Sequence, residues 1–280
     1  MIDVFYLDFL DGQGSKSLNS RLPYFKGQKF EPESPNIEWE TITLQRTNGV
    51  VIPTHPRDIV YKPRTITVTI FFNSIIDANF YQWRQELFAL LVRPRPYYIS
   101  SNLLPNRRFL VTCGGQFSIP KPEKNNATSF TVNFTNITGV AESVQRSIIP
   151  QNLSGENWNV GMNLDDRDDR EYFFEKQKTF QVYNPGNVMI NTMEHDYNVT
   201  FNGTGKNISI INHTSGEKVT INQELKKSQS VTNVRQYLVV NNTRLKTSGR
   251  IPGLDVGINK FEILNCDDFT IKFDTRFYYS

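Results

Sequence analysis

Short runs in which apolar and polar residues alternate make up most of this chain, and they restrict it to a mainly β fold. In "RTITVTIFF", residues 64–72, Ile66, Val68 and Ile70 fall on one side of an extended backbone and threonines fall on the other. This period of two is typical of a half-buried β-strand, because successive side chains of a strand point to opposite faces. Asn, Gly, Ser and Asp separate further runs of this kind, which indicates strands joined by turns.

One segment departs from this pattern and predicts an amphipathic α-helix. It lies in "DANFYQWRQELFALLVRPRPYYI", residues 77–99, where apolar residues recur at helical spacing. Ser74 or Asp77 is placed to cap its start. Pro94 is expected to end it, because the residue before a proline is disfavoured in the α region. The apolar stripe is wide enough to lie on a sheet, and its predicted anchors are Phe80, Trp83, Leu87, Leu90 and Leu91.

The chain is expected to form two domains, residues 1–150 and 151–280. A length of 280 residues slightly favours two domains over one. Periodicity is lost in "AESVQRSIIPQNLSGENWN", which places the boundary near Pro150. The second half consists of short strand patterns with turn residues at regular intervals, which favours an antiparallel sandwich or jelly roll. In the first half, the polar segment from Gly12 to about Glu38 is predicted to be loop.

A candidate hairpin lies in the first domain. The runs "WETITLQ" and "GVVIPT" are joined by "RTNG", whose Asn48-Gly49 pair is a typical hairpin turn, so a hairpin is expected from about Trp39 to Thr54. An exposed apolar strand edge is a liability in a monomer, and pairing between subunits would cover it. Val50, Val51 and Ile52 are therefore candidates for a contact between subunits, although an ordinary core hairpin would carry the same pattern.

The sequence shows no recognisable catalytic motif. His55, His195 and His213 are scattered without ligand spacing, and each is expected to be a surface histidine. A nucleophile elbow, a phosphate-binding glycine loop and a Cys-x-x-Cys pair are all missing from the sequence. We therefore expect no enzyme activity and no cofactor.

Ion binding and disulfide formation are also disfavoured by the residue pattern. The acidic run Asp165–Asp169 is interrupted by Arg167, which favours a solvated loop over a Ca²⁺ site. Cys113 and Cys266 stand far apart and are expected to be reduced thiols. No metal site is predicted.

Charge and hydropathy limit the partners. The formal net charge of +3 comes from 31 basic and 28 acidic residues mixed along the chain, whereas specific nucleic-acid binders concentrate their positive charge. No apolar run approaches the ~20 residues of a membrane span. The start "MIDVFYLDFLDG" lacks the basic region of a signal peptide, so synthesis in the cytoplasm is expected.

Several segments, taken in order, carry a family resemblance. "TITVTIFF", the helix, "RPRPYYI" and "RRFLVTCGGQFSI" follow one another in the first half, and "FQVYNPGNVMIN", "IPGLDVGINKFEI" and "FTIKFDTRFYY" follow in the second. This ordered set resembles the distal tail proteins of long-tailed bacteriophages that infect Gram-positive bacteria.

The resemblance implies a structural hub at the distal tip of the virion tail. It implies two β-sandwich domains, the first with a single packed helix and an extended hairpin that pairs across subunits of a hexameric ring, the second a galectin-like jelly roll. The implied partners are the major tail tube protein, the tape-measure protein, the tail-associated lysin or fibre hub protein, and receptor-binding or other baseplate proteins. The fold alone does not carry sugar binding. A carbohydrate- or receptor-binding protein acting through the second domain and a cell-wall hydrolase are the alternatives.

Overall fold

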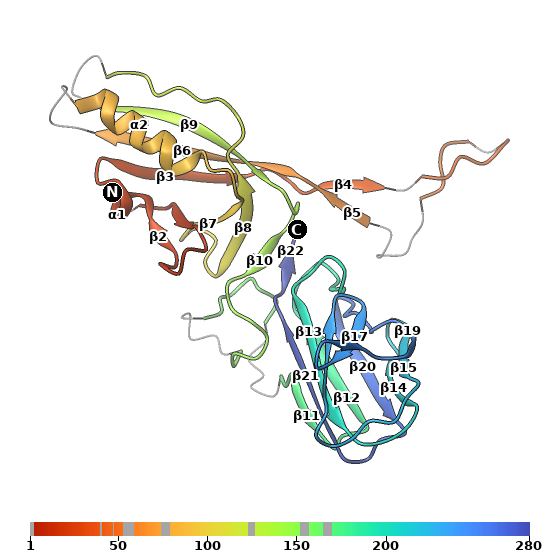
Figure 1. Cartoon of the computed structure of the whole chain (residues 1–280). Coiled ribbons are helices and arrows are strands. Elements are labelled where there is room, and N and C mark those ends of the chain that lie inside the picture. The colour runs from red at the N-terminus through yellow and green to blue at the C-terminus, as the bar shows by residue number, and fades with distance from the viewer. Residues whose placement is uncertain are drawn as a thin grey trace. The chain divides into compact units, whose positions relative to one another are not determined.

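The computed structural model describes residues 3–39, 41–46, 48–52, 59–73, 79–122, 127–151, 157–164 and 170–280. The chain divides into two compact units, Met1–Ala141 with Ser280, and Glu142–Tyr279. Strands predominate in both units, and the predicted mainly β fold is confirmed (Figure 1).

The first unit is built on one antiparallel sheet path in the order β2-β1-β7-β8-β9-β6-β3. Its long central strand β6 pairs with β9 over ten residue pairs and with β3 on its other side. The strands are β1 (Tyr6–Asp8), β2 (Lys16–Ser17), β3 (Phe25–Pro32), β6 (Arg64–Asn73), β7 (Tyr97–Ser100), β8 (Arg107–Thr112) and β9 (Ala127–Asn136).

Strand β3 corrects the prediction of a loop from Gly12 to Glu38. Its register shifts between Gly27 and Lys29, so the apolar residues lose the regular alternation that marks a strand in sequence. A side chain at Gly27 would have its Cβ 2.4 Å from the Cβ of Phe5, so the close approach of the two segments requires glycine there. The same predicted loop also contains a one-turn helix, α1 (Leu18–Arg21).

The predicted amphipathic helix is α2 (Phe80–Leu91), which lies along the sheet beside β6 and β9 (Figure 1). Its N-cap is Asn79, whose side chain makes no capping hydrogen bond, and the predicted caps lie outside the described residues. The helix ends before Val92, two residues short of Pro94.

The buried side of α2 packs against Phe72 of β6. The Phe72 ring centre lies 5.6 Å from that of Phe80 and 5.9 Å from that of Trp83. Leu90 is only half-buried, because a residue adjacent to Leu91 is turned about 100° around the helix axis. The other predicted anchors are buried: Phe80, Trp83, Leu87 and Leu91.

The second unit is a β-sandwich. One sheet has the order β11-β21-β13-β16-β17-β18 and the other has the order β12-β20-β14-β15-β19. The first sheet contains β11 (Phe173–Glu175), β13 (Tyr197–Gly203), β16 (Ser230–Val234), β17 (Tyr237–Val240), β18 (Thr243–Arg244) and β21 (Phe269–Thr275). The second contains β12 (Thr179–Asn184), β14 (Ile208–Asn212), β15 (Glu217–Ile221), β19 (Thr247–Gly249) and β20 (Gly257–Leu264).

Aromatic rings from both sheets fill the core of this sandwich. Phe174 of the first sheet stacks on Phe180 of the second, with ring centres 4.1 Å apart. Phe261 of the second sheet lies 4.9 Å from Phe273 of the first. Ring pairs at these separations add to the stabilisation that comes from burying their apolar area.

The residues that directly follow the first unit form hydrogen bonds and ion pairs within the second unit. Strand β10 (Ala141–Ser143) pairs with β22 (Tyr278–Tyr279), and the backbone N–H of Ser147 donates to the carbonyl of Thr275 at 2.8 Å. The guanidinium of Arg146 contacts the carboxylates of both Asp196 and Asp274. The contacts of these residues place the division between Ala141 and Glu142, whereas loss of periodicity in sequence falls near Pro150.

Candidate assembly interface

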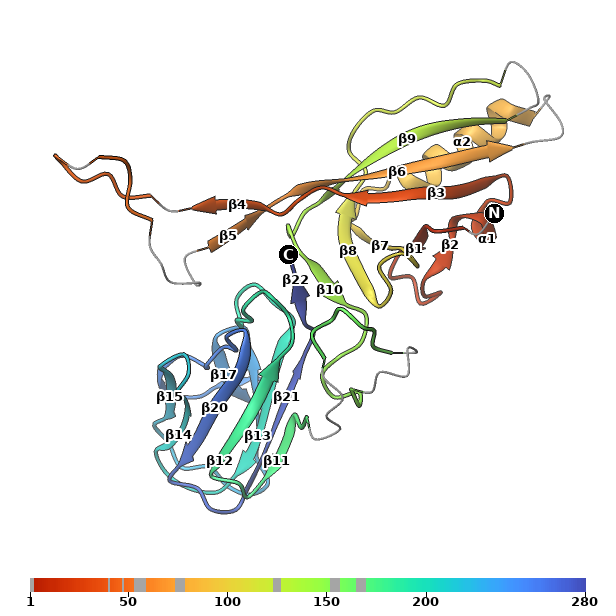
Figure 2. The same ribbon diagram turned by 180° about the vertical axis from the view of Figure 1, so that it is seen from behind.

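A hairpin arm leads away from the sheet of the first unit (Figure 2). Its base is the antiparallel pair β4 (Asn36–Trp39) and β5 (Ile59–Lys62), in which Trp39 faces Ile59. Farther out, Ile42 and Val51 exchange backbone hydrogen bonds of 2.8 and 2.9 Å. The arm is defined here as the described residues between Asn36 and Lys62.

The arm is longer than the hairpin predicted from about Trp39 to Thr54. Its ladder continues to Asn36 and Lys62, while Thr54 lies outside the described residues. Gly49 has φ of +78°, the left-handed conformation for which glycine is favoured at a tight turn.

Apolar side chains on the arm are exposed. Val50, Val51 and Ile52, the residues predicted to contact another subunit, have 54, 46 and 42% of their surface exposed. Sequence reasoning missed four others with similar exposure: Trp39, Ile42, Leu44 and Val60. Ile42 and Leu44 alternate with threonines in "TITLQ", but the pattern does not tell whether the apolar face is covered.

The arm has little internal support. Its base carries an ion pair between Lys62 and Glu38, whose side chains are both exposed, and such pairs contribute at most about 1 kcal/mol. A two-stranded hairpin by itself is marginally stable in water. An apolar surface of this kind typically marks a protein contact, so the geometry of the arm suits assembly.

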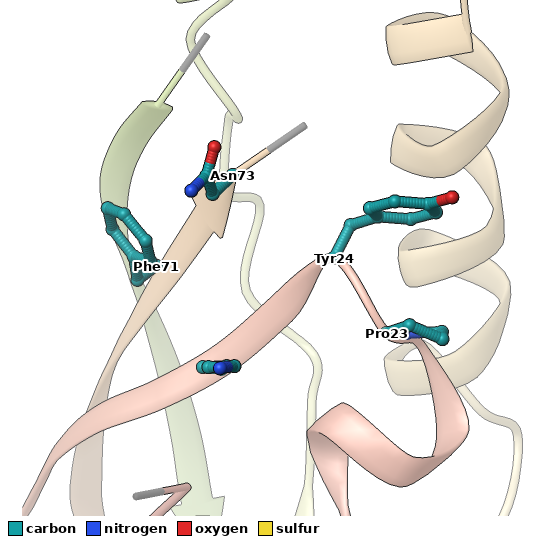
Figure 3. Close-up of a pocket in the computed structure, with 5 residues that line it drawn as sticks. Pro23, Tyr24, Phe71 and Asn73 are labelled. Carbon is teal, nitrogen blue, oxygen red and sulfur yellow. The ribbon is translucent and has the colours of Figure 1, made fainter. Parts of the chain in front are cut away.

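A shallow recess lies at the other end of strands β3 and β6 (Figure 3). It has a volume of about 310 Å³ and is lined by Pro23, Tyr24, Lys26, Phe71 and Asn73. The ring of Tyr24 lies 4.1 Å from that of Trp83, which supports one wall. Its polar side chains, Lys26 and Asn73, are not buried, so the recess lacks the convergent buried polar groups of a specific ligand site.

The histidines and cysteines form no site within the described chain. No group of His, Cys, Asp and Glu there could hold a metal ion, and both His55 and Asp165–Asp169 lie outside that part. His213 is exposed, and its Nε2 lies 2.8 Å from a carboxylate oxygen of Glu262. Burial raises the pKa of the Cys113 thiol to about 11, so it is an inert protonated thiol at neutral pH.

His195 is half-buried rather than a freely exposed surface histidine. Its ring lies 4.1 Å from that of Tyr278, and its Nδ1 accepts a hydrogen bond from the backbone N–H of Asn191 at 3.2 Å. Burial lowers the pKa of His195 to about 4, against an opposing effect of Glu194. The imidazole is therefore neutral in the folded chain at pH 7.

This neutral histidine is expected to make the second unit less stable in acid. Unfolding would expose an imidazole with a pKa of about 6.5, so stability is fully present above pH 6.5 and is lost as the pH falls toward 4. His195→Asn should remove up to about 3 kcal/mol of this pH-dependent loss. Urea unfolding at a series of pH values measures the free energy of unfolding of the unaltered chain and of His195→Asn. The same pH dependence in the two proteins would contradict the role given to His195.

Among the described helices, none is long and apolar enough to cross a membrane.

Comparison with known proteins gives a family match to part of the first unit and a similar fold for the whole chain. Residues 12–136 match the family described as phage tail protein RIFT-related domain. The crystal structure of the Dit (gp 19.1) protein of phage SPP1, described as a paradigm of the hub adsorption apparatus in phages infecting Gram-positive bacteria, is similar to this chain with a TM-score of 0.61 and 14% identity. That likeness covers 98% of this chain and 100% of the other.

Two structures of the phage P2 baseplate in its activated conformation, with Ca and with Sr, match at a TM-score of 0.41 and 10% identity. Each match covers 98% of both chains. No curated protein matches the chain in sequence. The family and the fold agree with the resemblance found in the sequence.

Proposed function

Because residues 12–136 match the family described as phage tail protein RIFT-related domain, we propose that this chain is a structural hub of a phage tail tip. In this proposal six copies form a ring at the distal end of the tail tube. The ring connects the tube to the tail fibre or tail lysin and to receptor-binding components. Its place in the virion is the distal tip of the tail, and its role is structural rather than catalytic.

The observation that carries the proposal is the exposed apolar arm. A ring is a closed heterologous assembly, in which each subunit presents two different complementary surfaces. An arm with exposed apolar residues from Trp39 to Val60 provides one such surface, because contact with a neighbouring copy would remove those side chains from water. Val50, Val51 and Ile52 are the residues proposed to make that contact.

The two units are proposed to have separate tasks. The first unit, with the arm, builds the ring and meets the major tail tube and tape-measure proteins. The second unit, a sandwich proposed to be galectin-like, is the attachment point for the lysin or fibre hub and for receptor-binding or other baseplate proteins. The proposal assigns no sugar ligand to the second unit, since a fold alone does not specify one.

Electron microscopy of the purified full chain tests the ring directly. We expect closed rings with sixfold symmetry, accompanied in solution by a mass six times that of one chain. Rings of another symmetry would overturn the number of copies. A monomer at all concentrations tested would overturn self-assembly of the isolated chain.

A further inference from the structure

The ring of Phe9, just after β1, is in contact with two arginines from distant parts of the chain. The guanidinium carbon of Arg93 is 3.6 Å from the ring centre and that of Arg21 is 4.6 Å from it. Tyr97 supports the same ring edge-on at 5.0 Å. Stacking on an aromatic ring fixes the plane of a guanidinium, so less conformational freedom is lost when it binds a ligand.

Neither guanidinium is neutralised within the described chain. Arg21 donates through Nη2 to the carbonyl of Leu7 at 3.3 Å, and its buried Nε has no hydrogen-bond partner. Arg93 donates through Nε to the carbonyl of Leu90 at 3.1 Å, and no described carboxylate forms an ion pair with either arginine. Both positive charges are therefore available to an outside group.

Another arginine stacked on an aromatic ring, Arg108, differs from Arg21 and Arg93 because it has a carboxylate partner. Arg108 lies 3.7 Å over the ring of Tyr98, but Asp8 stands 3.8 Å from its guanidinium. The local acidic side chain is thus placed against Arg108, whereas no carboxylate of the described residues pairs with the two arginines around Phe9.

Exposed apolar residues border the two arginines. Leu10, next to Phe9, is 62% exposed, and Val92, next to Arg93, is 53% exposed. Leu10 has φ of +58°, a conformation that residues other than glycine rarely adopt, and its N–H donates to Asp8 Oδ1 at 3.0 Å. Such unfavourable local geometry is often retained where a surface has a function.

We propose that Phe9, Leu10, Arg21, Val92 and Arg93 form a docking surface for an acidic, partly apolar segment of a partner protein. The flat forks of the guanidiniums match carboxylates in geometry and charge, and Leu10 and Val92 meet the apolar side chains between them. Nucleic acid fits this surface less well, because its phosphate backbone would leave the two large exposed apolar side chains uncovered. The surface contains no residue of the arm, so the inference does not depend on the proposed ring.

Binding of two fluorescent peptides to the full chain tests this surface. One peptide alternates glutamate with leucine, and the other alternates glutamine with leucine. We expect saturable binding of the glutamate peptide that weakens with salt, and at least tenfold weaker binding of the glutamine peptide, since a charge-assisted hydrogen bond is worth enough for a tenfold change. Binding of both peptides with equal affinity would overturn the role of the carboxylates.

Substitutions of the two arginines test whether the glutamate peptide binds at this surface. Arg93→Gln and Arg21→Gln should each weaken the glutamate peptide about tenfold, and Arg93→Lys, which keeps the charge but loses the fork, should fall between. Arg244→Gln is the matched control, because Arg244 is an exposed arginine 3.9 Å over the ring of Tyr237 in the second unit. We expect no effect of that control.

Three results would overturn the proposal. The first is an equal loss of binding in the Arg244→Gln control, which would mean a general charge effect. The second is tighter binding of an oligothymidylate than of the glutamate peptide, which would make the ligand a nucleic acid. The third is loss of self-assembly in Arg93→Gln alone, which would make the occupant a second copy of this chain.

Discussion

Aspartate at both Val50 and Ile52 is expected to leave the chain folded but unable to form a ring. These side chains are 54 and 42% exposed in the single chain, so charges there remain in water and cost the fold little. In an assembly that covers the arm, each charge would be buried without a partner, at a cost of about 3–5 kcal/mol. With one arm from each of several copies, the penalty is repeated around the ring. Size-exclusion chromatography with light scattering measures the outcome.

A matched variant in the second unit separates this effect from a general change of charge. Val256 and Ile258 are 53 and 43% exposed, so aspartate at both changes net charge and surface hydrophobicity by the same amount away from the arm. We expect this control to assemble as the unaltered chain does. If the arm variant also assembled normally while the unaltered chain formed rings, the contact would lie elsewhere and the ring proposal would stand.

Local patterns in the sequence were sufficient to predict the central strand β6 and the long helix α2. Strand β6 alternates without interruption over its length, because β9 pairs with it in one register over all ten residues and one face is buried. Helix α2 combines a wide apolar stripe with a proline just beyond its end. In both elements, local preference and tertiary packing favour the same structure.

Strand β3 and the full length of the arm could not be predicted from local sequence patterns. The register shift after Gly27 removes the period of two from β3, so its buried residues are too few and irregular to predict a strand. The base of the arm joins Asn36 to Lys62, a pairing that no local turn signal specifies. Whether the arm's apolar residues face a core or water depends on this long-range placement.

The proposed docking surface around Phe9 could not be predicted from the sequence either. Arg21 and Arg93 lie far apart in sequence, and each alone looks like an ordinary surface residue. Only the pairing of β1 with β7 brings Phe9 close to the chain that follows α2. That no described carboxylate pairs with either arginine is a property of the folded chain, so composition and spacing could not reveal it.

Phe72→Ala is expected to cause the largest loss of stability in the first unit. Phe72 is 1% exposed, and its ring lies 5.0 Å from Phe25 of β3 in addition to its contacts with Phe80 and Trp83 of α2. Alanine would leave a cavity where β3, β6 and the helix meet, and such changes cost about 3–5 kcal/mol. A shift of the urea midpoint at constant slope measures the loss.

Phe71→Ala supplies the matched control for this prediction. Phe71 is the neighbouring residue on β6, points to the opposite face and is half-buried beside the recess, so its loss should cost only about 1 kcal/mol (Figure 3). Equal losses in the two variants would mean that the helix-covered face does not hold the unit together. A large loss confined to Phe72 would instead place the stability of the proposed ring-building unit in the packing of α2, on a face that contains no residue of the arm. Assembly and folding could then be altered independently, because separate sets of apolar residues would serve them.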